Sequence, residues 1–201
     1  MNIAVFVSGN GSNLQVMIDA ERKGSLADGR IALVVSSRAD AYALQRAEQA
    51  GIKTFVLEDK DSSSREDYDK KVLDQLRQEK IETVVLAGFM RILSRVIIEP
   101  YSNKILNVHP ALLPEFKGAH GIRDAFQARR KKTGVTIHFV TEELDEGPII
   151  MQKEVLIDEK DTLESLEEKI HEVEHEIYPE AVRLFAEGKI FVKNGAVIIK
   201  E

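Results

Sequence analysis

The chain has 201 residues, of which 43% are hydrophobic and 31% charged, a balance that predicts a globular protein with a substantial core. Its net charge of −6 argues against a nucleic-acid partner, and the absence of cysteine excludes disulfides, thiolate nucleophiles and zinc–cysteine sites. No apolar run approaches the roughly 18 residues of a membrane-spanning helix, so we expect no membrane contact and a cytoplasmic location.

The first half of the chain alternates strand-like and helix-like segments. Apolar, β-branched runs predict strands at residues 3–7, 31–35, 54–57, 83–87 and 105–108. Helices are predicted from about Leu14 to Gly24, at residues 40–50, and after Ser64 as an N-cap. Short connections between such segments predict a mostly parallel, twisted α/β sheet with helices on both faces.

The second half predicts antiparallel additions to that sheet. Residues 135–140 and 149–157 are strand-like, and Asn194-Gly195 predicts a hairpin turn. Between them lies a long amphipathic helix that Pro179 is expected to kink or restart. Because no linker is evident, we expect one domain over residues 1–201, composed of halves at about 1–100 and 101–201.

A glycine turn from Gly9 to Asn13 separates the first strand from the first helix. Free N–H groups and the helix dipole at such a position favour an anion. The turn departs from the dinucleotide fingerprint, because Asn13-Leu14 stands at the third glycine, and a Walker lysine is absent. A phosphate monoester therefore fits better than a dinucleotide or a triphosphate, and a plain tight turn remains the alternative.

Asn107 and His109 lie at the end of a short apolar run, and Pro110 stops strand pairing after them. Side chains two apart on a strand point to the same face, so an amide and an imidazole project together. If Asp145 reached His109, it would orient and charge the imidazole, and the trio would suit carbonyl chemistry. The alternatives are a structural histidine and, for Asp145 in Leu144–Pro148, a plain turn.

Two other segments have competing interpretations. Residues 87–93 follow a buried strand and place one arginine among apolar side chains, which suits either a pocket for a flat aromatic ligand or a core helix. The basic run Arg129 to Lys132 is interpreted as a solvated helix end.

The remaining histidines give no metal signal. His120 and His138 have no metal-ligand spacing, and His171 and His175 are interpreted as a solvated helix face. On the same grounds Glu174 would be a surface carboxylate. The proposed chemistry needs no metal.

Taken together, five segments resemble the phosphoribosylglycinamide formyltransferases of purine biosynthesis, in family order across nearly the whole chain. The matching segments are Ser8–Gln15, Leu86–Leu93, Asn107–Pro114, Gly134–Val140 continuing to Leu144–Pro148, and Glu174–Pro179. The resemblance implies a Rossmann-like formyltransferase fold with the active site in a cleft between an N-terminal phosphate-binding half and a C-terminal catalytic, folate-binding half.

The resemblance also implies roles for individual residues. Asn107, His109 and Asp145 match the catalytic trio. Gly11, Ser12 and Asn13 would hold the 5-phosphate of glycinamide ribonucleotide, and Glu174 its glycinamide end. The residues implied around the co-substrate 10-formyltetrahydrofolate are Arg65, Met90, Arg91, Ile92, Leu93, Asn107, Thr141 and Asp145. The partners would be these two small molecules, and the protein a monomer or a homodimer.

The match is loosest from Phe116 to Lys132, where Lys117 replaces the proline that many relatives carry before the glycine. Four other functions compete, of which a formate-plus-ATP transformylase is disfavoured because the chain has no nucleotide-triphosphate loop. A formyltetrahydrofolate hydrolase would use the same trio, but its relatives carry an extra N-terminal domain, whereas the first strand here begins at residue 2 or 3. Methionyl-tRNA formyltransferase is disfavoured by the acidic charge and by the absence of a further C-terminal domain. A catalytically inactive ligand-binding module would not need an intact trio.

Overall fold

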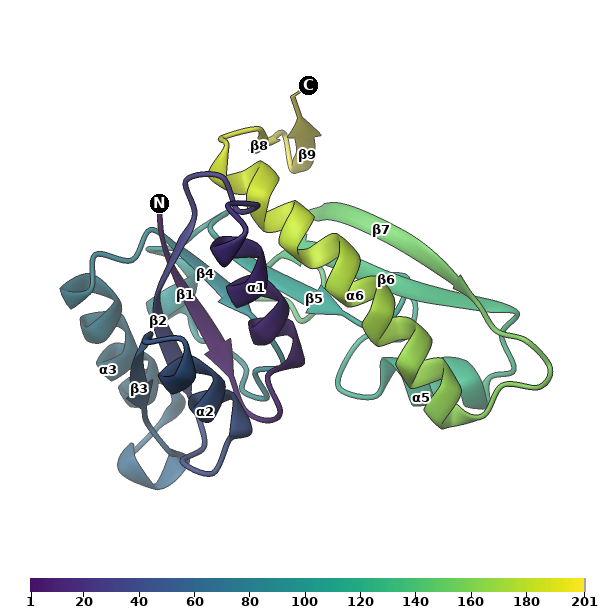
Figure 1. Cartoon of the computed structure of the whole chain (residues 1–201), viewed down its shortest axis with the longest axis horizontal. Helices are drawn as coiled ribbons and strands as arrows, with labels where there is room; N and C mark the ends of the chain where they lie inside the picture. The colour runs from purple at the N-terminus through teal and green to yellow at the C-terminus, as the bar shows by residue number, and fades with distance from the viewer. Residues whose placement is uncertain (201) are drawn as a thin grey trace.

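In the computed structural model, which describes residues 1–200, seven strands form one sheet in the order β3-β2-β1-β4-β5-β6-β7 (Figure 1). The strands are β1 (Asn2–Val7), β2 (Arg30–Ser36), β3 (Lys53–Val56), β4 (Thr83–Leu86), β5 (Ile105–His109), β6 (Lys132–Phe139) and β7 (Ile149–Leu156). Strands β1 to β5 pair in parallel, whereas β6 and β7 are added antiparallel. The predicted mostly parallel sheet with antiparallel additions is confirmed.

Helices cover both faces of the sheet, also as predicted. They are α1 (Ser12–Arg22), α2 (Tyr42–Gln49), α3 (Arg65–Gln78), α4 (Arg95–Ile98), α5 (Gly121–Gln127) and α6 (Leu163–Ala186), with a short 3₁₀ turn η1 (Asp59–Asp61). Apolar side chains of α1, α2 and α6 pack on one face, and those of α3 and α4 pack on the other. Alternate residues of β1 enter the two cores, as a strand buried on both faces requires.

Helix α6 continues through Pro179, so the restart that was one of the two expected effects of this proline does not occur. Tyr178 and Ala181 on either side of the proline are fully buried against the sheet. The Tyr178 hydroxyl also lies 2.9 Å from the backbone oxygens of both Leu86 in β4 and Leu106 in β5. Tertiary packing therefore outweighs the local cost of proline in this helix.

The Arg129–Lys132 run is exposed, as predicted, and it directly follows helix α5, which ends at Gln127. The N–H groups of Arg129 and Arg130 bond carbonyls of the last turn of α5, and Lys132 begins β6. Two local predictions are confirmed: Ser64 accepts the Asp67 N–H at the start of α3, and Asn194-Gly195 joins β8 (Ile190–Lys193) to β9 (Ala196–Ile199).

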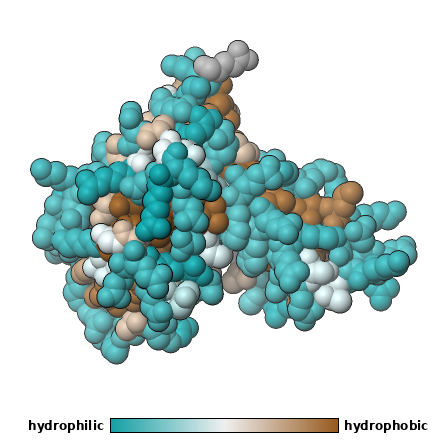
Figure 2. Space-filling model, in the orientation of Figure 1, coloured by the Kyte–Doolittle hydropathy of each residue, from teal (hydrophilic) through white to brown (hydrophobic). Residues whose placement is uncertain are grey.

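The visible surface is mostly hydrophilic, with small hydrophobic patches (Figure 2). Within residues 1–200, none of the helices combines the length and the apolar character needed to cross a bilayer.

Candidate active site

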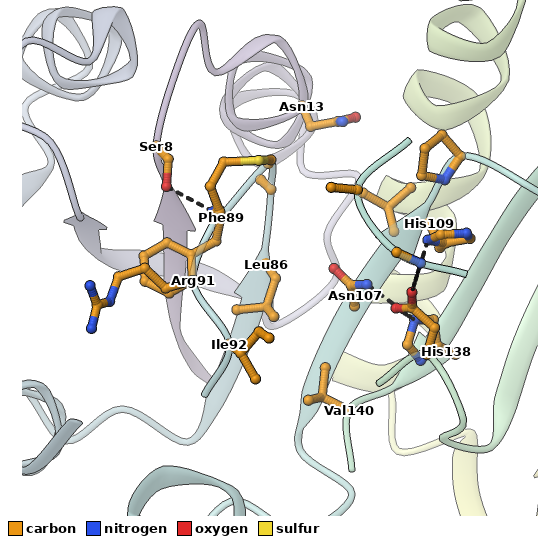
Figure 3. A pocket seen from close by; sticks show the side chains of 18 of the residues that line it. Ser8, Asn13, Leu86, Phe89, Arg91, Ile92, Asn107, His109, His138 and Val140 are labelled. Atoms are coloured by element: carbon orange, nitrogen blue, oxygen red, sulfur yellow. Dashed lines mark hydrogen bonds and ion pairs between the residues drawn. The ribbon is translucent and has the colours of Figure 1, made fainter. Parts of the chain in front are cut away.

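The loops at the carboxyl ends of β1, β4 and β5 surround one cavity of about 790 Å³. Its lining also includes His138 of β6, the segment 140–145, residues near the start of α5 and two side chains of α6. Figure 3 shows His109, Asn107 and His138 close together on one side of this cavity. Strands β1 and β4 are neighbours although the chain forms β2 and β3 between them, and such switch points bind ligands in open α/β sheets. The volume suits ligands of cofactor size, which occupy roughly 300–1,000 Å³.

The glycine turn after β1 lies in this lining and opens α1. Gly11 has a φ of 76°, and a Cβ atom there would lie 2.5 Å from the Ala43 Cβ, so glycine is required twice over. Arg46 fixes the turn by donating from Nε to the Asn10 carbonyl at 2.9 Å. No side chain caps the start of α1, so its first N–H groups remain available to an anion.

Strand β5 holds Asn107 and His109 on one face, as their spacing predicts. Their cross-strand neighbours on β6 are His138 and Thr136, respectively. The His109 side chain is buried, and its Nε2 lies 2.8 Å from the Phe116 backbone oxygen. Since a carbonyl oxygen can only accept, Nε2 carries a hydrogen. The other ring nitrogen, Nδ1, faces Asp145.

Asp145 is that carboxylate, and it lies between two imidazoles. Its Oδ2 is 3.5 Å from His109 Nδ1 and accepts the Gly118 N–H at 2.8 Å. Its Oδ1 is 3.6 Å from His138 Nε2. The structure therefore brings together the trio that the sequence left unconnected.

Gly147 explains how the loop that carries Asp145 closes onto β6. A Cβ atom at Gly147 would lie only 1.7 Å from the Phe139 backbone oxygen, so no other residue fits without moving the loop. Asp145 itself has a φ of 55°, a conformation that aspartate tolerates better than most residues. Backbone geometry thus fixes the position of the carboxylate.

His138 is a site residue that the sequence analysis missed. It is buried beside Asn107, whose Nδ2 lies 3.1 Å from His138 Nε2, and its Nδ1 lies 2.9 Å from the Phe139 oxygen. Burial lowers the pKa of His138 below its usual value. Metal-ligand spacing does not reveal this residue. The signal in the sequence is a histidine that alternates with Thr136 along an apolar strand, and only the structure shows that it lies opposite Asn107.

Glu174 corrects the view that it is a surface carboxylate. It is only 4% exposed, and its Oε2 accepts from Asn13 Nδ2 at 2.9 Å and from His171 Nδ1 at 3.0 Å. The bond to Glu174 raises the pKa of His171, which is half-exposed. Helix α6 therefore presents a charged group to the glycine turn of α1, inside the cavity lining.

The segment 87–93 forms a loop rather than a core helix, and it lines the cavity. Ser8 Oγ anchors it by accepting the Met90 N–H at 2.9 Å, and the Arg91 guanidinium lies 3.8 Å from the centre of the Tyr68 ring. Met90 and Ile92 are 74% and 55% exposed, so two large apolar side chains face solvent here.

The other predicted ligand residues divide into two groups. Leu93 and Thr141 lie in the cavity lining, whereas Arg65, at the start of α3, lies outside it and approaches Glu66 at 3.7 Å. Over the described residues 1–200, no three His, Cys, Asp or Glu side chains are grouped in a way that could hold a metal ion.

The fold is that of a formyl transferase, and the chain belongs to that family, which it matches over residues 1–182. It is 41% identical to phosphoribosylglycinamide formyltransferase of Escherichia coli K12 over 98% of this chain and 92% of that protein. It also matches the trifunctional purine biosynthetic protein adenosine-3 of Gallus gallus at 42% identity, spanning 98% of this chain but 20% of that protein. Among solved structures, glycinamide ribonucleotide transformylase 1 of Symbiobacterium toebii superimposes with a TM-score of 0.97, at 42% identity, over 100% of this chain and 94% of that one.

Proposed function

We propose that this protein transfers the formyl group of 10-formyltetrahydrofolate to the primary amine of glycinamide ribonucleotide. The observation that carries the proposal is the convergence of Asn107, His109 and Asp145 on one cavity that also contains an uncapped helix start. An amide, an imidazole and a carboxylate around a single reacting carbon are the groups that acyl transfer to an amine requires.

The ribonucleotide would bind between α1 and α6. Its phosphate would accept hydrogen bonds from the first turn of α1, at Gly11, Ser12 and Asn13, where the helix dipole favours negative charge. Glu174 would hold the glycinamide end, because its Oε1 is not occupied by the two donors that bind Oε2. The N-terminal half, at about residues 1–100, would thus supply the phosphate site.

The folate would bind at the apolar mouth of the cavity and supplies a formyl group activated on its N10 atom. Met90, Ile92 and Leu144 are large, exposed and part of the lining, which suits a flat aromatic ligand. Arg91, Leu93 and Thr141 would complete this part of the site. Arg65 would act only on a part of the ligand that extends beyond the cavity.

Asn107 and a protonated His109 would donate hydrogen bonds to the formyl oxygen as negative charge develops there. Each such donor is typically worth roughly 3–4 kcal/mol of barrier. The amine nitrogen forms a bond to the formyl carbon, the bond from that carbon to N10 breaks, and one amine proton moves to N10. Asp145 would orient His109 and order a water molecule that carries this proton.

One contact must change before His109 can act in this way. Its Nε2–H donates to the Phe116 carbonyl, 2.8 Å away. If Nε2 is to donate to the formyl oxygen, this oxygen must replace the Phe116 carbonyl, so the segment around Phe116 must move away from His109.

An absorbance assay of folate deformylation, run with and without glycinamide ribonucleotide, tests the proposal. We expect turnover only with the ribonucleotide, and one formylated product for each folate released. Formate release without the ribonucleotide would instead identify a hydrolase, and binding of both ligands without turnover would identify an inactive module.

A further inference from the structure

The hydrogen bonds of His138 determine which of its nitrogens carries the proton. Its Nδ1 lies 2.9 Å from the Phe139 backbone oxygen, which can only accept, so Nδ1 is protonated. In the neutral ring Nε2 is then an acceptor. The Asn107 atom that lies 3.1 Å from Nε2 must therefore be a donor, and the only donor in this side chain is its NH₂ group. The donor and acceptor roles of His138 therefore fix which end of the Asn107 amide is nitrogen, independently of how its oxygen and nitrogen are assigned in the coordinates.

The surroundings of His138 favour the neutral ring. The ring is buried between β5 and the 140–145 segment, and burial lowers its pKa. The ionisable groups that face it are Asp145, whose Oδ1 lies 3.6 Å from Nε2, and His109. A proton on Nε2 would make this nitrogen a donor facing Asp145 and leave Asn107 without its acceptor.

We propose that His138 is a positioning residue, which holds the Asn107 amide with its NH₂ group towards the reacting carbon. This inference rests on the proposed function. One N–H of Asn107 bonds His138 and, within residues 1–200, the other has no protein partner, so it is available to the formyl oxygen.

The reason that such a partner is needed lies in the symmetry of an amide. Its oxygen and nitrogen have nearly the same size, so packing alone does not distinguish the two orientations. In the reverse orientation the Asn107 oxygen would face the developing negative charge and oppose the reaction. A single acceptor at the His138 position therefore decides whether Asn107 assists or hinders.

Two neutral variants separate the two hydrogen bonds of His138. Glutamine places its side-chain oxygen near the position of Nε2, so His138→Gln keeps an acceptor for Asn107. Asparagine reaches only the position of Nδ1, so His138→Asn keeps the bond to Phe139 and removes the acceptor. We expect His138→Asn to lower kcat at least about 10-fold, up to the loss in Asn107→Ala of about 10²-fold, and His138→Gln to recover most of it.

A double-mutant cycle gives the decisive measurement. If His138 acts through Asn107, His138→Asn should change kcat less than about 2-fold once Asn107→Ala is present. The KM for glycinamide ribonucleotide should stay constant in all variants, because Glu174 and the glycine turn are untouched, and thermal unfolding should confirm that each variant is folded.

The outcomes also separate this inference from the proposed function. A parent protein without formyl transfer would contradict the proposed function itself. With an active parent, additive losses in the cycle, equal kcat in the two His138 variants, or a loss that appears in KM rather than kcat would each overturn the role of His138.

Discussion

Two of the cavity's histidine–carboxylate pairs differ in origin and environment. His171 and Glu174 lie one turn apart on α6, with 3.0 Å between Nδ1 and Oε2. His109 and Asp145 come from β5 and from the loop after β6, with 3.5 Å between Nδ1 and Oδ2. The His171 side chain is 52% exposed, whereas that of His109 is 4% exposed.

This difference in exposure implies a difference in role. Water screens the half-exposed His171 pair, so its charge can contribute little beyond orienting Glu174. The His109 pair lies where the effective dielectric constant is low, so each charge acts strongly on a reacting group beside it. We therefore expect the chemistry at the buried pair and ligand orientation at the helical pair, and the following changes test that division.

The largest effect is expected from breaking the buried pair. His109→Ala and Asp145→Ala should each lower kcat at least about 10²–10³-fold, because a donor to the formyl oxygen or the group that orients it is lost. Steady-state kinetics on folded protein would measure this. Asn107→Ala should cost less, since His109 remains. The exposed His120 provides the matched control, because His120→Ala removes an imidazole that lines no part of the cavity. Wild-type-like turnover in His109→Ala or Asp145→Ala would refute the catalytic assignment.

Gly147 tests the same pair without touching either member. Adding a Cβ atom 1.7 Å from the Phe139 oxygen must displace the loop, and Asp145 moves with it. Since a displacement of about 1 Å can cost about 10²-fold in rate, Gly147→Ala should lower kcat by a similar factor. Unchanged kcat in a folded Gly147→Ala protein would mean that the position of Asp145 is not critical.

The two pairs also explain what the sequence could and could not predict. Strand runs, helix caps and the Asn194-Gly195 turn depend on neighbours in the chain, and these predictions are confirmed. Asn107 and His109 share a face because a strand has a period of two. The contact with Asp145 depends on loop closure at Gly147, which no local pattern encodes.

Burial that arises between elements is equally absent from local patterns. The polar neighbours of Glu174 on its helix indicate a surface position, and only the family resemblance gives it a binding role, but α1 packs against α6 and buries it. His138 has no metal-ligand spacing, and its partner Asn107 lies directly opposite on β5. In both cases the missing information was which elements are neighbours in space.

An intermediate effect is expected from the helical pair's carboxylate. Glu174→Gln removes the charge that would hold the glycinamide end, so the KM for glycinamide ribonucleotide should rise about 10-fold, the loss of roughly one charged hydrogen bond, with a smaller change in kcat. Glu172→Gln, an exposed change on the same helix, should leave both constants unaltered. A fall in kcat at constant KM would place Glu174 in the chemical step. It would contradict the inference that the helical pair only orients the ligand.

The smallest effect is expected from His171 and concerns stability. Its hydrogen bond to Glu174 raises its pKa in the folded protein above the usual 6.5. The protonated form is thus favoured by folding, so this contribution is fully present below pH 6.5 and is lost as the pH rises through the folded pKa. Because His171 is half-exposed, we expect at most about 1 kcal/mol. Thermal unfolding of wild type and His171→Gln should therefore differ more at about pH 6 than at about pH 8.5, whereas Glu172→Gln should show no such trend. A difference that grows with pH would reverse the sign and exclude the ion pair as its cause.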